Sequence, residues 1–294
     1  MSLILGHAAS DIGFLVADTL LSFPNEKYDA RKPAIERFHA LKIHILTPEI
    51  AVAFAGNVER ALKIIRRLQE DLAVDSSVSA PERLLDLSRE LAVEKSERFR
   101  GDCEFLVLTL GVEQKTLARI ATNQVHYATR AYIGDPAEYK RLRGLTRDYD
   151  GPAKRFFQDP DGKPQTAIVT DGEKEFEQVS TAMERLTDQK NSETVGAICG
   201  CVTRVVDARI SKKLEYMQSG ERGISAAEGI TGFSLLASNS ETRGIGIYYY
   251  GWNAGLIFVV GDAVPCRKET ATTIKQFVEA GKSKYGLSLE GVLW

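Results

Sequence analysis

The N-terminal stretch MSLILGHAASDIGFLVAD (residues 1–18) contains the first indication of the fold. Two apolar runs, LILGHA and FLVAD, are separated by the turn-like residues DIG, which predicts a hairpin of two short strands. Asp18 ends the second run. Removal of Met1 would make Ser2 the first residue, with a free amine beside its hydroxyl. The hairpin thus carries a serine where it begins and an acid where it ends.

The rest of the chain alternates blocks of strands with blocks of helices. Residues 25–40 are polar and contain Pro33, so we expect a loop there, and the segment LKIHILTPEIAVAFAGN predicts a second hairpin. We further expect helices over 58–72 and 80–99, three or four strands over 103–135, a helix over 136–143 after Asp135, helices over 180–186 and 192–212, strands over 229–240, 244–251 and 256–261, and a closing helix over 268–286.

This order predicts a mixed α/β (α+β) fold in which two antiparallel sheets pack together with helix layers outside them. Residues 144–176 are polar and rich in Gly, Pro and Asp, and we interpret them as a surface insertion. No linker or internal repeat divides the sequence, so we expect one domain over residues 1–294.

Composition narrows the functional class. The 294 residues carry a formal net charge of −2, and 44% are hydrophobic, as in globular proteins. Near-neutral charge without a basic stripe argues against nucleic-acid binding, and no apolar run is long enough to cross a membrane. The N-terminus lacks the pattern of an export signal, and four cysteines in a chain of this length favour a reducing compartment. We expect a cytoplasmic protein.

Several common site signatures are absent from the sequence. It contains no phosphate-binding loop, dinucleotide fingerprint, zinc-protease motif or nucleophile elbow, and Cys199 and Cys201 do not have the spacing of a zinc or redox pair. The four histidines show no spacing that proposes a serine–histidine–acid triad. We expect neither a cofactor nor a metal ion.

One set of residues remains: Ser2 and Asp18 of the first hairpin, Lys42 at the start of KIHIL and Gly56 in FAGN. With this set the sequence resembles the proteasome-like β-subunit family of the N-terminal nucleophile hydrolases. In that family a nucleophile opens the first strand, an acid ends an apolar run in the second, a lysine begins the third, and an Ala-Gly pair precedes the first helix. Ser2, Asp18, Lys42 and Gly56 stand at these places, in MSLIL, FLVAD, KIHIL and FAGN. The steps from Ser2 to Asp18 and from Lys42 to Gly56 resemble the family's own steps. The resemblance implies a four-layer αββα sandwich.

Two weaker matches lie further along the chain. YIGD resembles a family segment that usually ends in glycine-serine, with Asp135 in place of the serine. EGITG resembles an acid-x-x-serine-glycine segment, with Glu228 for the aspartate and Thr231 for the serine. The order of elements matches from about residue 2 to the C-terminus, outside 144–176 and the loop near 212–226, whereas the individual residues match best over 2–57.

The resemblance implies cleavage of peptide or amide bonds by Ser2 after Met1 is removed. A hydroxyl needs a base, and the α-amine of an N-terminal Ser2 has a pKa near neutrality. Lys42 would add positive potential, Asp18 would hold Lys42 charged and oriented, and the N–H of Gly56 would stabilise the oxyanion.

Other activities are compatible with the same residues. Asp135 in place of a serine, and the Met1 that precedes Ser2, would suit a catalytically inactive subunit with a structural or binding role. An amidase acting on small molecules would share the fold and the nucleophile. Because proteasome-like subunits assemble as rings, the resemblance implies a homo-oligomer for both the catalytic and the inactive subunit. The substrate and any unfoldase partner are left open.

Overall fold

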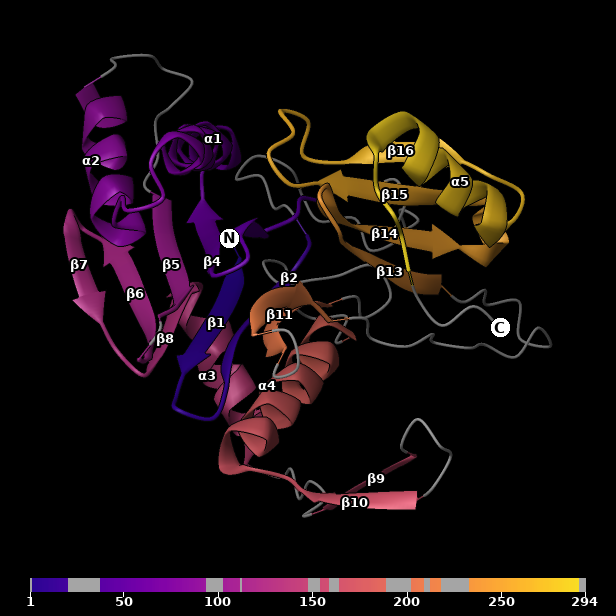
Figure 1. The fold of residues 1–294 in the computed structure, drawn as a ribbon, viewed down its shortest axis with the longest axis horizontal. Coiled ribbons are helices and arrows are strands. Elements are labelled where there is room, and N and C mark those ends of the chain that lie inside the picture. Colours follow the sequence, from indigo (N-terminus) through magenta and orange to yellow (C-terminus); the bar gives the residue numbers. More distant parts are fainter. Residues whose placement is uncertain are drawn as a thin grey trace.

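The computed structural model describes residues 2–20, 38–93, 103–111, 113–147, 154–158, 164–188, 202–208, 212–217 and 233–290 (Figure 1). These residues form a mixed α+β protein. They contain three antiparallel sheets of four or five strands, a separate two-stranded hairpin and five α-helices. Within the described residues, no helix is both long enough and apolar enough to cross a membrane.

The N-terminal sheet has the strand order β12-β11-β2-β1-β8, with every neighbouring pair antiparallel. Its strands are β1 (Leu3–Ala8), β2 (Gly13–Asp18), β8 (Arg130–Gly134), β11 (Val202–Ala208) and β12 (Lys213–Tyr216). β1 and β2 are the predicted hairpin, closed by a hydrogen bond from Ala9 N to Ile12 O (2.9 Å). β8 lies at the edge of the sheet beside β1, with Leu3 opposite Gly134.

The second sheet is a meander in which neighbouring strands follow one another along the chain. Its strands are β3 (Ile43–Thr47), β4 (Ile50–Gly56), β5 (Cys103–Leu110), β6 (Lys115–Ala121) and β7 (Gln124–Tyr127). Thr122 and Asn123, between β6 and β7, have φ angles of 50° and 60°. Two successive residues with positive φ are typical of the tightest hairpin turns.

The two sheets pack face to face, because both faces of their central strands are apolar: one face meets the other sheet and the opposite face meets helices. In β4, Ala51 and Ala53 face the core shared with the N-terminal sheet, whereas Val52 and Phe54 face the opposite side. In β1, Ile4 lies in the shared core and its neighbours point outward. The shared core therefore lies between the two sheets.

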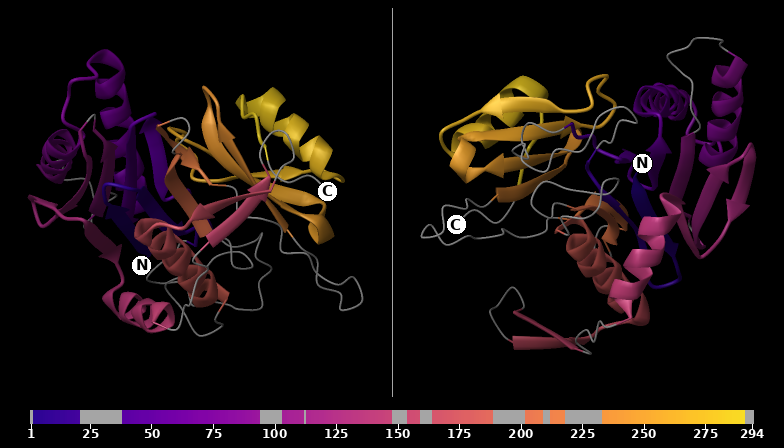
Figure 2. Two further views of the ribbon diagram at one scale, coloured as in Figure 1. Left: turned by 60° about the horizontal axis from the view of Figure 1, so that its bottom comes forward. Right: turned by 180° about the vertical axis from the view of Figure 1, so that it is seen from behind.

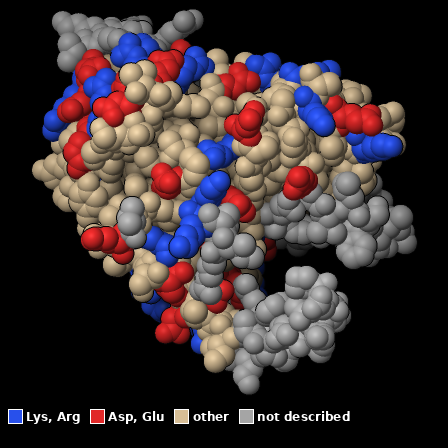
Figure 3. All heavy atoms as spheres, in the orientation of Figure 1, with Lys and Arg blue, Asp and Glu red and all other residues tan. Residues whose placement is uncertain are grey.

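A pair of helices covers the outer face of each sheet (Figures 1 and 2). α1 (Val58–Val74) and α2 (Ala80–Val93) pack on the meander, and α3 (Pro136–Thr146) and α4 (Asp171–Asp188) pack on the N-terminal sheet. Acidic and basic side chains are interspersed on the solvent side of α1 and α2 (Figure 3). Among them, Arg83 pairs with Asp71 and Glu90.

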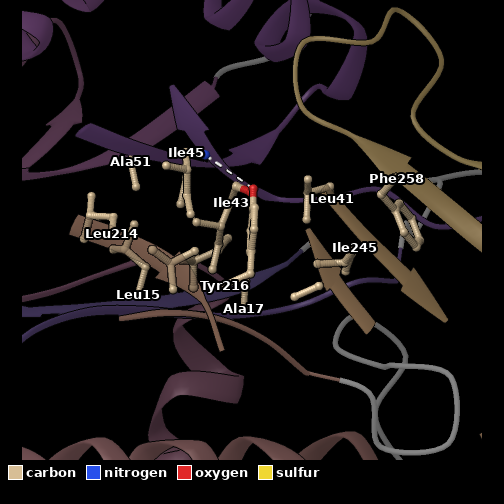
Figure 4. Packing of buried hydrophobic residues seen from close by; sticks show 14 of the residues in the cluster. Leu15, Ala17, Leu41, Ile43, Ile45, Ala51, Leu214, Tyr216, Ile245 and Phe258 are labelled. Atoms are coloured by element: carbon tan, nitrogen blue, oxygen red, sulfur yellow. Dashed lines mark hydrogen bonds between the residues drawn. The ribbon is translucent and has the colours of Figure 1, made fainter. Parts of the chain in front are cut away.

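The C-terminal sheet consists of β13 (Phe233–Asn239), β14 (Arg243–Tyr249), β15 (Ala254–Val259) and β16 (Arg267–Thr270), with a 3-10 turn at Tyr250–Trp252. One of its faces contributes to the shared core, and α5 (Ile274–Tyr285) packs on the other. Tyr216 of β12 lies in that core and joins the parts: its hydroxyl donates to Ile43 O (2.7 Å) and accepts from Ile45 N (3.3 Å), as Figure 4 shows in part.

Several predicted elements are confirmed. Both N-terminal hairpins, the helix from residue 58, the helix from residue 80 as far as Val93, four strands between 103 and 134, and the helix after Asp135 all form. The strands expected over 229–261 also form, but they pair with one another and with β16 as a separate third sheet. The last helix begins at Ile274, because β16 occupies the start of the segment expected to be helical.

One predicted helix was wrong, and another formed but began earlier than predicted. The helix expected over 192–212 is strand β11 from Val202 to Ala208, where β-branched residues pair with β2; residues 192–201 lie outside the described residues. The helix expected from 180 begins at Asp171, inside the segment interpreted as an insertion. That segment also holds the hairpin β9 (Lys154–Gln158) and β10 (Pro164–Ile168), which Figures 1 and 2 draw apart from the three sheets.

Candidate active site

Ser2 lies immediately before β1 and is held by hydrogen bonds of the backbone. Ser2 as a whole residue is buried, with 8% of its surface exposed. Asp135 N donates to Ser2 O (2.8 Å), and Leu3 N donates to Asp18 Oδ1 (3.4 Å). The residue predicted to be the nucleophile therefore sits between the end of β2 and the end of β8.

Lys42 and Asp18 form an ion pair in which both side chains are completely buried. Lys42 Nζ donates to Asp18 Oδ1 (2.8 Å) and to Leu20 O (2.6 Å). Burial lowers the pKa of Lys42 below its ordinary value, while the charge of Asp18 and the hydrogen bond to it act in the opposite direction. The same carboxylate oxygen thus receives the buried ammonium and the N–H that follows Ser2.

The sequence brings these two residues together from different sheets. The apolar run of β2 ends at Asp18, and Lys42 stands just before β3, between the buried residues Leu41 and Ile43. Both neighbours of Lys42 are core residues, so its backbone runs through the interior, and its side chain is itself fully buried. The ion pair therefore joins the N-terminal sheet to the meander.

Gly56 lies close by, at the last position of β4. Phe54, two residues before Gly56 in β4, donates its N–H to Lys42 O (3.1 Å). Gly56 has a φ of 106°, a conformation that other residues adopt only with strain. Asn57 then caps α1 by accepting from Arg60 N (3.0 Å), and the N-terminus of this helix supplies positive potential beside Gly56.

Asp135 reaches the site through its backbone, whereas its side chain caps α3. Its carboxylate accepts from Ala137 N (2.8 Å) and Glu138 N (3.3 Å). The residue that stands in place of a serine in the family segment therefore stabilises a helix terminus as well as bonding Ser2 O. Glu228 and Thr231, the two weaker candidates, lie outside the described residues.

The structure adds residues that the sequence did not single out. Thr19, which directly follows Asp18, and His39 are both buried, and Thr19 Oγ1 lies 3.2 Å from His39 Nδ1. Glu104 of β5 accepts from Gly134 N (2.9 Å), next to the residue that bonds Ser2. Both contacts join residues far apart in the chain, and no local sequence motif predicts either of them.

A second polar cluster lies away from Ser2, on the outer side of β1. His7 Nδ1 is 3.3 Å from Glu175 Oε1, and Arg130 also pairs with Glu175. These residues line a cavity of about 450 Å³ between α3, α4 and the N-terminal sheet. Within the described residues, no group of three or more His, Cys, Asp or Glu side chains is arranged to hold a metal ion.

The site thus brings Ser2, Asp18, Lys42 and the backbone of Asp135 together. Gly56 follows two residues after Phe54, whose N–H bonds to Lys42 O. No protein-family model and no curated protein sequence matches this chain.

Proposed function

We propose that this chain is a proteasome-like N-terminal nucleophile hydrolase that cleaves peptide or amide bonds with Ser2 after Met1 is removed. The observation that carries the proposal is the fully buried Lys42–Asp18 pair, whose carboxylate also accepts the N–H following Ser2. A buried ion pair is an inefficient way to stabilise a fold, because the cost of dehydrating both charges offsets their attraction. Buried charges beside a potential nucleophile are typical of catalytic sites.

The packing of the chain supports the same proposal. Two antiparallel sheets share a core, and each carries a helix pair on its outer face. This is the arrangement expected of the four-layer αββα sandwich that the sequence resemblance implies. On this interpretation the C-terminal sheet with α5 extends the shared core beyond residues 2–57, where the individual residues match the family best.

The proposed reaction is acyl transfer to a hydroxyl. Ser2 Oγ attacks the carbonyl carbon of the scissile amide while its proton passes to the α-amine of the same residue. The carbonyl electrons move to the oxygen, and the Gly56 N–H stabilises this oxyanion. The C–N bond then breaks, the leaving amine takes the proton, and water hydrolyses the remaining ester to free Ser2. Lys42 favours the deprotonated amine by its charge, and Asp18 holds Lys42 in place.

A catalytically inactive structural or binding subunit is the second candidate. The observation that favours it is the use of the Asp135 carboxylate as the cap of α3, at a place where the family segment has a serine hydroxyl. Both candidates imply a homo-oligomer. Light scattering at micromolar concentration tests this part, and a strictly monomeric mass would contradict it.

The catalytic proposal is tested by intact-mass analysis and hydrolysis of a library of peptide amides. We compare the wild-type protein with Ser2→Ala and with Ser10→Ala, a control in the exposed turn between β1 and β2. We expect wild type and Ser10→Ala to lack Met1 and to hydrolyse the same peptides, and Ser2→Ala to be inactive. Full activity of a protein that still carries Met1 would contradict the proposal. If all three proteins lack Met1 and none hydrolyses a peptide, the result would favour the structural subunit.

A further inference from the structure

Glu104 of β5 joins the two packed sheets at the place where the N-terminal strand begins. Its Oε1 accepts a hydrogen bond from Arg119 Nη2 (2.6 Å), and its Oε2 accepts one from Gly134 N (2.9 Å). Arg119 belongs to β6 of the meander, whereas Gly134 is the last residue of β8 in the N-terminal sheet. A single carboxylate therefore fixes the end of β8 relative to the meander.

The end of β8 in turn fixes Ser2. Leu3 and Gly134 stand opposite each other, and Leu3 N turns toward Asp18 while Gly134 N turns toward Glu104. The next N–H, that of Asp135, donates to Ser2 O (2.8 Å). Within the described residues, β8 is the edge strand of the N-terminal sheet. No further described strand of that sheet lies beyond it to accept a hydrogen bond from Gly134 N, and Glu104 of the other sheet accepts it instead.

The backbone at Gly134 is bent in a way that depends on close contact with Ser2. Its φ is +98°, and a Cβ at this position would lie 1.8 Å from Ser2 O and 3.5 Å from the Cβ of Ala55. Only glycine fits such an approach. The bend lets the following N–H reach Ser2 O, and the hydrogen bond to Glu104 holds the bent residue from its other side.

The value of the Glu104 contacts is geometric. The side chains of Glu104 and Arg119 are 29% and 39% exposed, and ion pairs with such exposure contribute little to stability. A hydrogen bond from a backbone N–H to a carboxylate is stronger than one between neutral groups. Arg119 is itself placed against the ring of Tyr132 (6.0 Å), which stacks on Tyr139 of α3 at 3.7 Å.

We propose that Glu104, oriented by Arg119, is a positioning residue that sets the place of Ser2 through Gly134 and the Asp135 N–H. This inference rests on the proposed function, since it concerns the attack by Ser2. Misplacement of a nucleophile by about 1 Å lowers the rate of the chemical step by about a hundredfold. Glu104 acts on the nucleophile through Gly134 and the Asp135 N–H rather than by binding substrate, so its loss lowers kcat and leaves KM nearly unchanged.

The test compares kcat and KM of Glu104→Ala, Glu104→Gln and Arg119→Ala for a peptide amide that the wild-type protein hydrolyses. Glu90→Ala, which also removes a partly exposed carboxylate from an arginine, is the matched control. We expect kcat to fall about 10- to 100-fold in Glu104→Ala. Glu104→Gln keeps an acceptor for Gly134 N and retains most of kcat, Arg119→Ala is intermediate, and Glu90→Ala equals wild type.

Hydrogen exchange of the Gly134 amide gives a readout that does not depend on catalysis. We expect its protection to fall in Glu104→Ala and to persist in Glu104→Gln. If Ser2-dependent hydrolysis is present and Glu104→Ala keeps kcat within twofold of wild type, this inference fails alone; equal losses in the Ala and Gln variants also overturn it. If Glu104→Ala does not fold, an unchanged kcat in Arg119→Ala overturns it. Absence of Ser2-dependent hydrolysis in the wild type overturns both this inference and the proposed function.

Discussion

Replacement of Asp18 by alanine probes the buried ion pair on which the site is built. The variant removes the carboxylate from Lys42 and leaves the ammonium group in a completely buried place. Among the described residues, Leu20 O is the hydrogen-bond acceptor that Lys42 retains. The folded state must therefore keep an uncompensated charge away from water.

The cost follows from that burial. Removing one partner of a buried pair lowers the free energy of unfolding by about 3–5 kcal/mol, a large share of the 5–15 kcal/mol typical of a domain. Lys42→Met should cost a similar amount, because it leaves the Asp18 carboxylate buried. The double variant Asp18→Ala/Lys42→Met buries no charge, so it should be more stable than the sum of the two single losses by about 2 kcal/mol or more.

Loss of Asp18 should also change the dependence of stability on pH. Burial already lowers the pKa of Lys42, and the contribution of Asp18 that opposes this shift disappears in the variant. Between the lowered pKa and the ordinary value of 10.5, the unfolded chain binds more protons than the folded one. The stability of Asp18→Ala should therefore rise with pH in this window, over a wider range than in wild type.

Urea unfolding followed by tryptophan fluorescence at pH 7 and pH 9 measures both effects. The three variants and wild type form a double-mutant cycle. Single losses below about 1 kcal/mol, or losses that simply add in the double variant, would refute the reasoning that Lys42 and Asp18 are a coupled, dehydrated pair.

Three further changes can be tested by the same unfolding measurement. Gly134→Ala should lower the free energy of unfolding by about 2 kcal/mol or more, because the φ of Gly134 is +98° and a Cβ would lie 1.8 Å from the carbonyl oxygen of Ser2. Gly144→Ala, where α3 leaves open space for a Cβ, should be neutral or stabilising, and equal effects of the two changes would contradict this. Burial lowers the pKa of His44 to about 4, so between pH 7 and pH 5 the unfolded chain takes up a proton that the folded chain does not. Acidification over this range should therefore destabilise the wild type by about 2 kcal/mol more than a His44→Gln variant. A variant of the exposed His126, His126→Gln, is the control and should behave as wild type. Asp135→Ala should lose the cap of α3 and about 1 kcal/mol, and an unchanged stability would argue against the cap.

Local sequence patterns predicted the elements that carry the site. The turn between β1 and β2, the alternation that makes the two hairpins, and the cap at Asp135 each depend on a few neighbouring residues. Asp18 and Lys42 could be paired because a family resemblance supplied the long-range contact that their local patterns lack. Their complete burial was not evident from the strands alone.

The wrong predictions had different physical causes. Residues 202–208 were expected to be helical, but pairing with β2 outweighs whatever helical preference the segment has. The start of α4 did have a local signal: Thr170 and Glu173 form a reciprocal capping box, with Glu173 N donating to Thr170 Oγ1 (3.3 Å) and Thr170 N to the Glu173 carboxylate (2.8 Å). The polar composition of the segment concealed that signal.

The contacts of Glu104 could not have been predicted from the sequence. Its two partners lie on β6 and β8, and the hydrogen bond to Gly134 N exists only because the edge of one sheet meets a side chain of the other. Such a contact depends on how two sheets pack, which single-strand patterns do not specify.

The most direct test of catalysis by Ser2 is the site at which an acylating probe reacts. The protein is incubated with a β-lactone, which acylates activated hydroxyls, and is then examined by intact-mass and peptide mass spectrometry. We predict loss of Met1 and a single adduct on Ser2, present in Ser10→Ala and absent from Ser2→Ala. A protein that keeps Met1 and acquires no adduct, or acquires its adduct at another residue, would contradict the assignment of Ser2 as the nucleophile.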